Sequence, residues 1–139
     1  MRLYVDSNVL ICYIKQELGG LIKAQAIRTK EFFVKCRKEK HILIISDFAL
    51  TEIQKAAYYS REEVEEFLKN FEILFEVIET TREIKEKSNS LLRTGIHRPD
   101  NLHVQLAIDS KAEAVVTWNL RDFKKTENII RCYSPADLL

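Results

Sequence analysis

Short runs of apolar, often β-branched residues alternate along the chain with longer segments whose apolar positions recur at helical spacing. The short runs predict buried strands, and the spacing of three or four residues predicts amphipathic helices. Strands are expected at residues 3–5, 41–45, 72–79, 114–117 and 129–133. Helices are expected from residue 7, over 21–38 after a break at Gly19-Gly20, over 46–58, from residue 60, over 80–94 and over 99–112.

Polar residues mark where several of these helices begin. Ser7 is placed to cap the first helix. Ser60 with Glu63, and Thr80 with Glu83, have the spacing of a capping box, in which side chains and backbone amides bond reciprocally.

Strands that alternate with helices require crossover connections, which are right-handed and place the strands parallel. We therefore predict an α/β fold, a three-layer α/β/α domain with a central, mostly parallel sheet of four to five strands. The length of 139 residues predicts a single domain over residues 1–139. In such folds ligands gather beyond the carboxyl ends of the strands, which is where functional residues are expected.

Charge and cysteine content narrow the function. Twenty-two basic against 21 acidic residues exclude a strongly basic coat for nucleic acid, although a local basic patch remains open. The three cysteines are widely spaced and form no metal or disulfide pattern, so we expect buried thiols in a reducing cytoplasm. Without an apolar run of about 18 residues or a signal peptide, no contact with a membrane is expected and the protein is expected to be cytoplasmic.

Acidic residues follow the predicted strands at one edge of the sheet. Asp6 ends the first strand, Glu52 lies on the helix after the second, Asp100 begins the helix before the fourth, and Asp122 follows the fourth with Asn119 beside it. Clustered carboxylates repel one another and stay ionised only if cations neutralise them. Oxygen ligands select a hard ion, Mg²⁺ or Mn²⁺, which can activate water for phosphodiester hydrolysis.

Each acidic residue also has a structural interpretation. Asp6 could cap the first helix, Glu52 could be a solvated helix residue, Asp100 could only complement the helix dipole, and Asp122 could cap the next turn.

Three neighbouring residues are not assigned to the site. Asp109 lies nine residues after Asp100, which places it on the opposite helix face. Asp47 is interpreted as a first-turn partner of the helix dipole. His103, one turn after Asp100, could face the site, but a structural role is favoured.

The acidic residues lie in motifs that resemble those of the PIN-domain nucleases over nearly the whole chain. The segment VDSNVLI resembles the first strand and turn of the family, and SDFALTEI resembles the second motif, with Glu52 after Thr51. The segment PDNLHVQLAIDSKAEAVVTWNLRDF resembles the third and fourth motifs joined. Asn119 stands where many members carry an acid; an amide oxygen can bind a metal or orient a water but adds no charge.

The resemblance implies a metal-dependent endoribonuclease, and small stand-alone members are often the toxins of VapBC-type toxin–antitoxin pairs, dimeric and blocked by a small antitoxin protein. Asp6, Glu52 and Asp100 would hold Mg²⁺ or Mn²⁺, completed by Asp122 and Asn119 through water. A metal-activated water would attack the RNA phosphate in line, leaving a 3′-hydroxyl and a 5′-phosphate. Supporting hydrogen bonds would come from Ser7, Thr51 and Thr117.

RNA must also be held, and a single strand is usually bound by cations along its backbone and flat side chains under its bases. Candidates near the predicted site are His97, Arg98, Trp118, Arg121, Lys124 and Lys125. Trp118 could instead pack in the core, and the last three could be ordinary surface charge.

Other functions stay open. The chain could be a housekeeping RNA-processing nuclease, or a catalytically weak PIN-fold module that binds RNA or acts as a scaffold, which Asn119 favours. A response-regulator-like signalling domain also combines an acidic pocket with this fold class. It needs a phosphorylatable aspartate after a central strand, and only Asp47 follows the second strand, where it is placed to start a helix.

Overall fold

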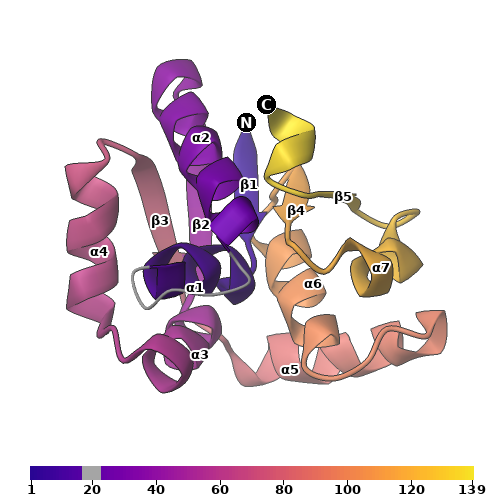
Figure 1. The fold of residues 1–139 in the computed structure, drawn as a ribbon. Coiled ribbons are helices and arrows are strands. Elements are labelled where there is room, and N and C mark those ends of the chain that lie inside the picture. The colour runs from indigo at the N-terminus through magenta and orange to yellow at the C-terminus, as the bar shows by residue number, and fades with distance from the viewer. Residues whose placement is uncertain (17–22) are drawn as a thin grey trace.

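A five-stranded parallel sheet forms the centre of the molecule, with helices on both faces (Figure 1). The computed structural model describes residues 1–16 and 23–139. The strands are β1 (Arg2–Val5), β2 (Ile42–Ser46), β3 (Leu74–Ile78), β4 (Ala114–Val116) and β5 (Arg131–Tyr133). Their order across the sheet is β3-β2-β1-β4-β5, and every neighbouring pair is parallel. The predicted three-layer α/β/α fold is therefore confirmed.

The helices before the fourth strand lie in the order that the apolar pattern predicts, and a short helix between the fourth and fifth strands was not predicted. The helices are α1 (Ser7–Lys15), α2 (Lys23–Glu39), α3 (Asp47–Ala57), α4 (Arg61–Asn70), α5 (Arg82–Ser88), α6 (Asp100–Asp109) and α7 (Leu120–Phe123), with 3₁₀ helices η2 (Asn89–Thr94), η3 (Lys124–Thr126) and η4 (Ala136–Leu138). No helix within residues 1–16 and 23–139 is long and apolar enough to cross a membrane.

Successive side chains of the central strands point to opposite faces of the sheet and form two separate cores. On β1, Leu3 and Val5 pack with α1, α2, α3 and α4, whereas Tyr4 packs with α6, η2 and α7. All three side chains are inaccessible to solvent. Because β1 is covered on both faces, its carboxyl end is held rigidly at the middle of the sheet edge.

Aromatic packing holds α1 in place directly after that strand. Tyr13 on α1 packs against Phe33, Phe67 and Phe71, with ring centroids 5.7, 5.4 and 5.9 Å away. Such tilted and edge-to-face pairs add about 0.5–1.5 kcal/mol each beyond the area they bury. Helix α1, which follows Asp6, is thereby tied through its last turn to α2 and α4.

The three cysteines are buried and form no disulfide, as expected. Burial raises the pKa of Cys36 and of Cys132 to about 12, so both thiols stay protonated at neutral pH.

Of the two capping boxes predicted from the sequence, one is present and the other is displaced by one residue. The capping box of Ser60 with Glu63 is confirmed. In contrast, Thr81 rather than Thr80 caps α5, accepting a hydrogen bond from the Ile84 amide. Thr80 is unavailable because its amide and hydroxyl both donate to Asp47.

Segment ends also differ. The helix expected over 80–94 ends at Ser88 and continues as η2 to Gly95, whose positive φ of 95° ends it. Helix α6 ends at Asp109, three residues before the expected end, and β3 and β5 are shorter than expected. The Gly19-Gly20 break and the expected helix start at Leu21 lie outside the described residues.

Asp47 ties the start of α3 to the loop before α5. Its Oδ1 atom accepts hydrogen bonds from the amides of Phe48 and Thr80, both at 2.8 Å, and from the Thr80 hydroxyl.

We therefore expect Asp47→Ala to lower the free energy of unfolding by about 2 kcal/mol, because donors are left unpaired in a partly buried position. Urea unfolding followed by circular dichroism measures this change, and a loss below about 0.5 kcal/mol would contradict it.

Candidate metal centre

Asp6 lies at the carboxyl end of β1, in the N-cap position of α1, and is 5% exposed. Its amide donates to the Val116 carbonyl at 2.9 Å, which continues the pairing of β1 with β4. Its side chain makes no capping hydrogen bond. Instead, Asp6 Oδ2 accepts from the Thr117 hydroxyl at 2.8 Å, so the carboxylate faces the sheet edge rather than the helix.

Thr117 fixes the direction of that carboxylate. It is fully buried just after β4, and its Oγ1 atom also accepts from the Asn8 amide group at 3.2 Å and from the Asn119 backbone amide at 2.9 Å. With both acceptor positions filled, the hydroxyl proton is directed to Asp6. Thr117 therefore has the supporting position predicted for it, and Asn8 is an additional polar residue of this network that the sequence did not single out.

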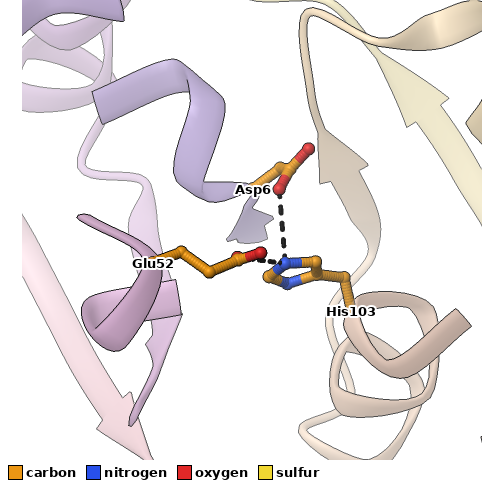
Figure 2. A group of neighbouring side chains, drawn as sticks. All are labelled: Asp6, Glu52 and His103. Carbon is orange, nitrogen blue, oxygen red and sulfur yellow. Dashed lines mark hydrogen bonds and ion pairs between the residues drawn. The ribbon is translucent and has the colours of Figure 1, made fainter. Parts of the chain in front are cut away.

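Glu52 on α3 and His103 on α6 meet Asp6 at the sheet edge (Figure 2). His103 Nε2 lies 2.7 Å from Glu52 Oε1 and 3.5 Å from Asp6 Oδ1. Glu52 Oε1 also accepts from the Ser7 hydroxyl at 2.9 Å. The bond to Ser7 shows that Ser7 does not cap α1 as expected, because its hydroxyl is directed to the acidic site.

His103 is buried beneath the carboxylates. It is 1% exposed, and its Nδ1 atom lies 2.7 Å from the Tyr4 hydroxyl, which in turn lies 2.8 Å from Ser46 Oγ. The ring also packs against Phe48 at a centroid distance of 5.0 Å. A sequence signal for this position existed, since His103 lies one helical turn after Asp100, but the pattern alone favoured a structural role.

Burial and mutual repulsion govern the protonation of the acidic groups. Burial raises the pKa of Asp6, although His103 and Thr117 act against it. Burial, followed by repulsion from Asp6, raises the pKa of Asp100 from an ordinary value of 3.8 to about 6, with smaller contributions from Asp122 and Glu52. Asp100 therefore lies close enough to the other three carboxylates to feel their charge, and the four predicted acids do converge.

The imidazole offsets part of this repulsion. Burial opposes a charge on His103, but the hydrogen bond with Glu52 and the charge of Asp6 outweigh burial and raise its pKa. In the same way, burial alone would raise the pKa of Glu52, but the bonds from His103 and Ser7 lower it.

Asn119 and Asp122 lie together after β4. Asn119 Nδ2 donates to Asp122 Oδ2 at 2.9 Å. Asp122 lies within α7, and its carboxylate engages Asn119 while also acting on Asp100. With the Asn119 nitrogen bonded to Asp122, its side-chain oxygen is the atom left to face a ligand.

The residues present fit a divalent cation. One ligand atom from each of Asp6, Glu52 and His103 lies within 4.8 Å of the others, in a buried to partly buried position. Carboxylate oxygens favour hard ions, whereas His103 Nε2 carries the proton shared with Glu52 and would have to lose it to become a ligand. A cation here would relieve the repulsion that raises the pKa of Asp100.

The remaining predicted residues lie around or away from this centre. Thr51 is exposed and donates its hydroxyl to the Asp47 carbonyl, so it is not directed to the carboxylates. The Trp118 indole donates to Thr29 at 3.0 Å and packs against the core that contains Leu3 and Val5. Exposed side chains are found at His97 and Arg98, before α6, and at Arg121 on α7.

Solved structures with similar folds include two toxin–antitoxin assemblies. A chain of the VapBC2 complex from Rickettsia felis, bound to a DNA fragment from its promoter, is 20% identical with a TM-score of 0.67, covering 96% of this chain and 98% of that one. A chain of a toxin–antitoxin complex from Klebsiella pneumoniae is 19% identical with a TM-score of 0.64, covering 96% and 97%. No protein-family model and no curated protein matches the sequence. The likeness confirms the fold that the motifs predicted, a PIN fold of the VapC type.

Without a metal, Asp100→Asn is expected to stabilise the protein at pH 7. The folded chain binds the Asp100 proton more tightly than the unfolded chain, so the contribution of this group to stability falls as pH rises from 3.8 through about 6. Because the side chain is partly exposed, solvent screening limits the gain to the order of 1 kcal/mol, or roughly 3 °C in Tm.

Thermal unfolding in EDTA measures this gain, which should nearly vanish at pH 4. The matched control is Asp109→Asn on the same helix, which removes a carboxylate bonded to Gln105 and paired with Lys87 and should give no gain. A destabilised Asp100→Asn at pH 7 would contradict the repulsion described above.

Proposed function

We propose that this protein is a metal-dependent endoribonuclease, the toxin of a VapBC-type toxin–antitoxin pair. The observation that carries the proposal is the convergence of Asp6, Glu52, Asp100 and Asp122 on one edge of a VapC-type PIN fold, where burial and then the charge of Asp6 raise the pKa of Asp100 to about 6. These carboxylates come from separate elements far apart in the sequence, and a surface charged only for solubility would not bring them together.

Asp6, Glu52 and Asp100 hold Mg²⁺ or Mn²⁺ in this proposal, with Asp122 and Asn119 completing the site through water. When bound, the ion lowers the pKa of a coordinated water and stabilises charge developing on the RNA phosphate. The protein groups orient this centre beforehand: Thr117 fixes Asp6, Ser7 and His103 fix Glu52, and Asn119 fixes Asp122.

His103 holds a proton between the carboxylates. Its Nε2–H donates to Glu52, and its other nitrogen is held by Tyr4, whose hydroxyl reaches Ser46 at the end of β2. This chain of hydrogen bonds fixes the ring from below. The carboxylates are therefore kept close together while no cation is present.

The RNA strand would reach this centre across the exposed rim. Arg98 and His97 immediately precede α6, and Arg121 lies on α7 beside Asp122. We propose these three as phosphate contacts, whereas Trp118, with its indole N–H bonded within the protein, is at most an edge contact.

The toxin assignment rests on the fold shared with the two toxin–antitoxin complexes. It implies a small antitoxin protein as partner, a homodimer, and action on cytoplasmic RNA. A housekeeping nuclease would share the chemistry but lack the partner. A scaffold module would bind RNA and metal without cleaving.

Cleavage of a mixed panel of single-stranded and structured RNAs is expected to require Mg²⁺ or Mn²⁺ and to stop in EDTA. Asp6→Asn and Asp100→Asn should each lower the cleavage rate by roughly two orders of magnitude or more, because each removes a charge that holds the ion. Gel analysis of labelled RNA, with Mn²⁺ titrated calorimetrically, measures both properties.

The control is Asp109→Asn, which should cleave at the rate of the unaltered protein. Tight Mn²⁺ binding without cleavage of any RNA would favour the scaffold module. Cleavage that survives in both site variants would overturn the assignment of these ligands.

Production of the protein in a bacterial host is expected to arrest growth, and production of Asp6→Asn is not. Co-production of the short protein encoded beside the gene should restore growth and co-purify with the chain. Growth arrest that the neighbouring product does not relieve would point to the housekeeping nuclease instead.

A further inference from the structure

A groove opens beside the metal centre, between α5 and the segment that leads into α6. Its volume is about 460 Å³. Its lining includes three cations, Arg82, Lys85 and Arg98, and three apolar side chains, Phe48, Pro99 and Leu102; the other lining residues are acidic or polar. No residue proposed above as a metal ligand lines it, so it is a separate surface.

The groove is nevertheless continuous with the centre. Phe48 lines the groove while its ring packs on His103, with ring centroids 5.0 Å apart. Pro99 and Leu102 also line it, and they flank Asp100 in the sequence. The groove therefore borders the centre at Phe48 and at the start of α6.

Positive charge in the groove is not compensated by the protein. Arg82 pairs with Glu86, the acidic residue of the groove, at 3.2 Å. Lys85 and Arg98 have no ion pair or side-chain hydrogen bond with any residue in the described part of the chain. Lys85 and Arg98 therefore face solvent without a partner in the described part of the chain, although an acidic centre lies nearby.

An apolar floor with cations at its rim matches the chemistry of an unpaired nucleotide. A base can lie on Phe48, Pro99 and Leu102 while its flanking phosphates meet Lys85 and Arg98. In a duplex the bases are stacked and paired inside the helix, so only the phosphates could use this surface. The apolar half of the groove therefore discriminates between the two forms of RNA.

We propose that this groove is the subsite for one unpaired nucleotide of the substrate near the scissile phosphate. The inference rests on the proposed function for its substrate and assigns the side of the centre on which the strand lies. Lys85 and Arg98 bind the phosphates, and the apolar floor receives the base.

The test is the binding of a fluorescently labelled single-stranded RNA of ten nucleotides, measured by anisotropy in EDTA so that nothing is cleaved. The double variant Lys85→Ala with Arg98→Ala should bind roughly tenfold more weakly. The slope of log affinity against log salt should fall by about 1.4, since each phosphate contact on a single strand contributes about 0.7. The same RNA annealed to its complement should bind the unaltered protein more weakly.

The matched control is Arg37→Ala with Lys38→Ala, which removes the same two charges from the last turn of α2, at the amino-terminal edge of the sheet. This control should bind RNA within twofold of the unaltered protein. Calorimetry should give the same Mn²⁺ affinity for the groove variant as for the unaltered protein, which excludes an effect through the metal centre.

Equal losses in the groove variant and the control, or duplex binding as tight as single-strand binding, would overturn the groove. If RNA is still cleaved with metal in that case, the proposed nuclease activity stands and only its substrate path is wrong. Absence of both RNA binding and cleavage would overturn the groove and the nuclease together.

Discussion

The site depends on the buried carboxylate of Asp6 at the end of the central strand. The parallel register pairs Val5 with Val116, so the next residues, Asp6 and Thr117, emerge at the same level and bond to each other. β2 flanks β1 on the other side, and the helix that follows it carries Glu52. The strand order β2-β1-β4 thereby places ligand groups from distant segments on one edge without any long loop to support them.

Collecting carboxylates at this edge is unfavourable in itself, and His103 reduces that cost. Its Nε2 atom lies within hydrogen-bond distance of Glu52 and 3.5 Å from Asp6, while Tyr4 and Ser46 hold the opposite side of the ring. The two carboxylates therefore keep their positions before a cation arrives, so little reorganisation accompanies binding. Burial, followed by repulsion from Asp6, raises the pKa of Asp100, and the charge of His103 offsets only part of this rise.

The general position of the site could be predicted from the sequence because it follows from chain order. A strand ending in Asp6, a second strand before Glu52 and a fourth before Asp122 suffice once the strands are taken as parallel. The resemblance indicated Ser7 and Thr117 as supporting residues, but which carboxylate each one bonds to could not be predicted from chain order. Whether Thr80 caps a helix or bonds to Asp47 depends on contacts 33 residues apart, and a competing long-range bond displaced the cap by one residue.

The role of His103 was hidden for a similar reason. Its spacing from Asp100 places it on the correct helix face, but only the packing of α6 against Tyr4 and Phe48 buries its ring beneath Glu52. The groove is even harder to predict, since its lining is drawn from α3, α5, the start of η2, the segment before α6 and the first turn of α6. These segments come together only in the folded chain, and no local sequence pattern predicts that they do.

Residues of the metal centre and residues of the groove differ in how strongly their replacement would affect folding. Asp6, Thr117 and His103 are buried and bonded to the core, so replacing one of them leaves a buried polar group unpaired. Lys85 and Arg98 are exposed and unpaired within the described residues, so replacing them should hardly affect folding. The fold shared with complexes only 19–20% identical is compatible with this division. In the proposed nuclease, the metal chemistry would depend on residues anchored in the core, and the choice of RNA would depend on a surface that can vary without disturbing that core.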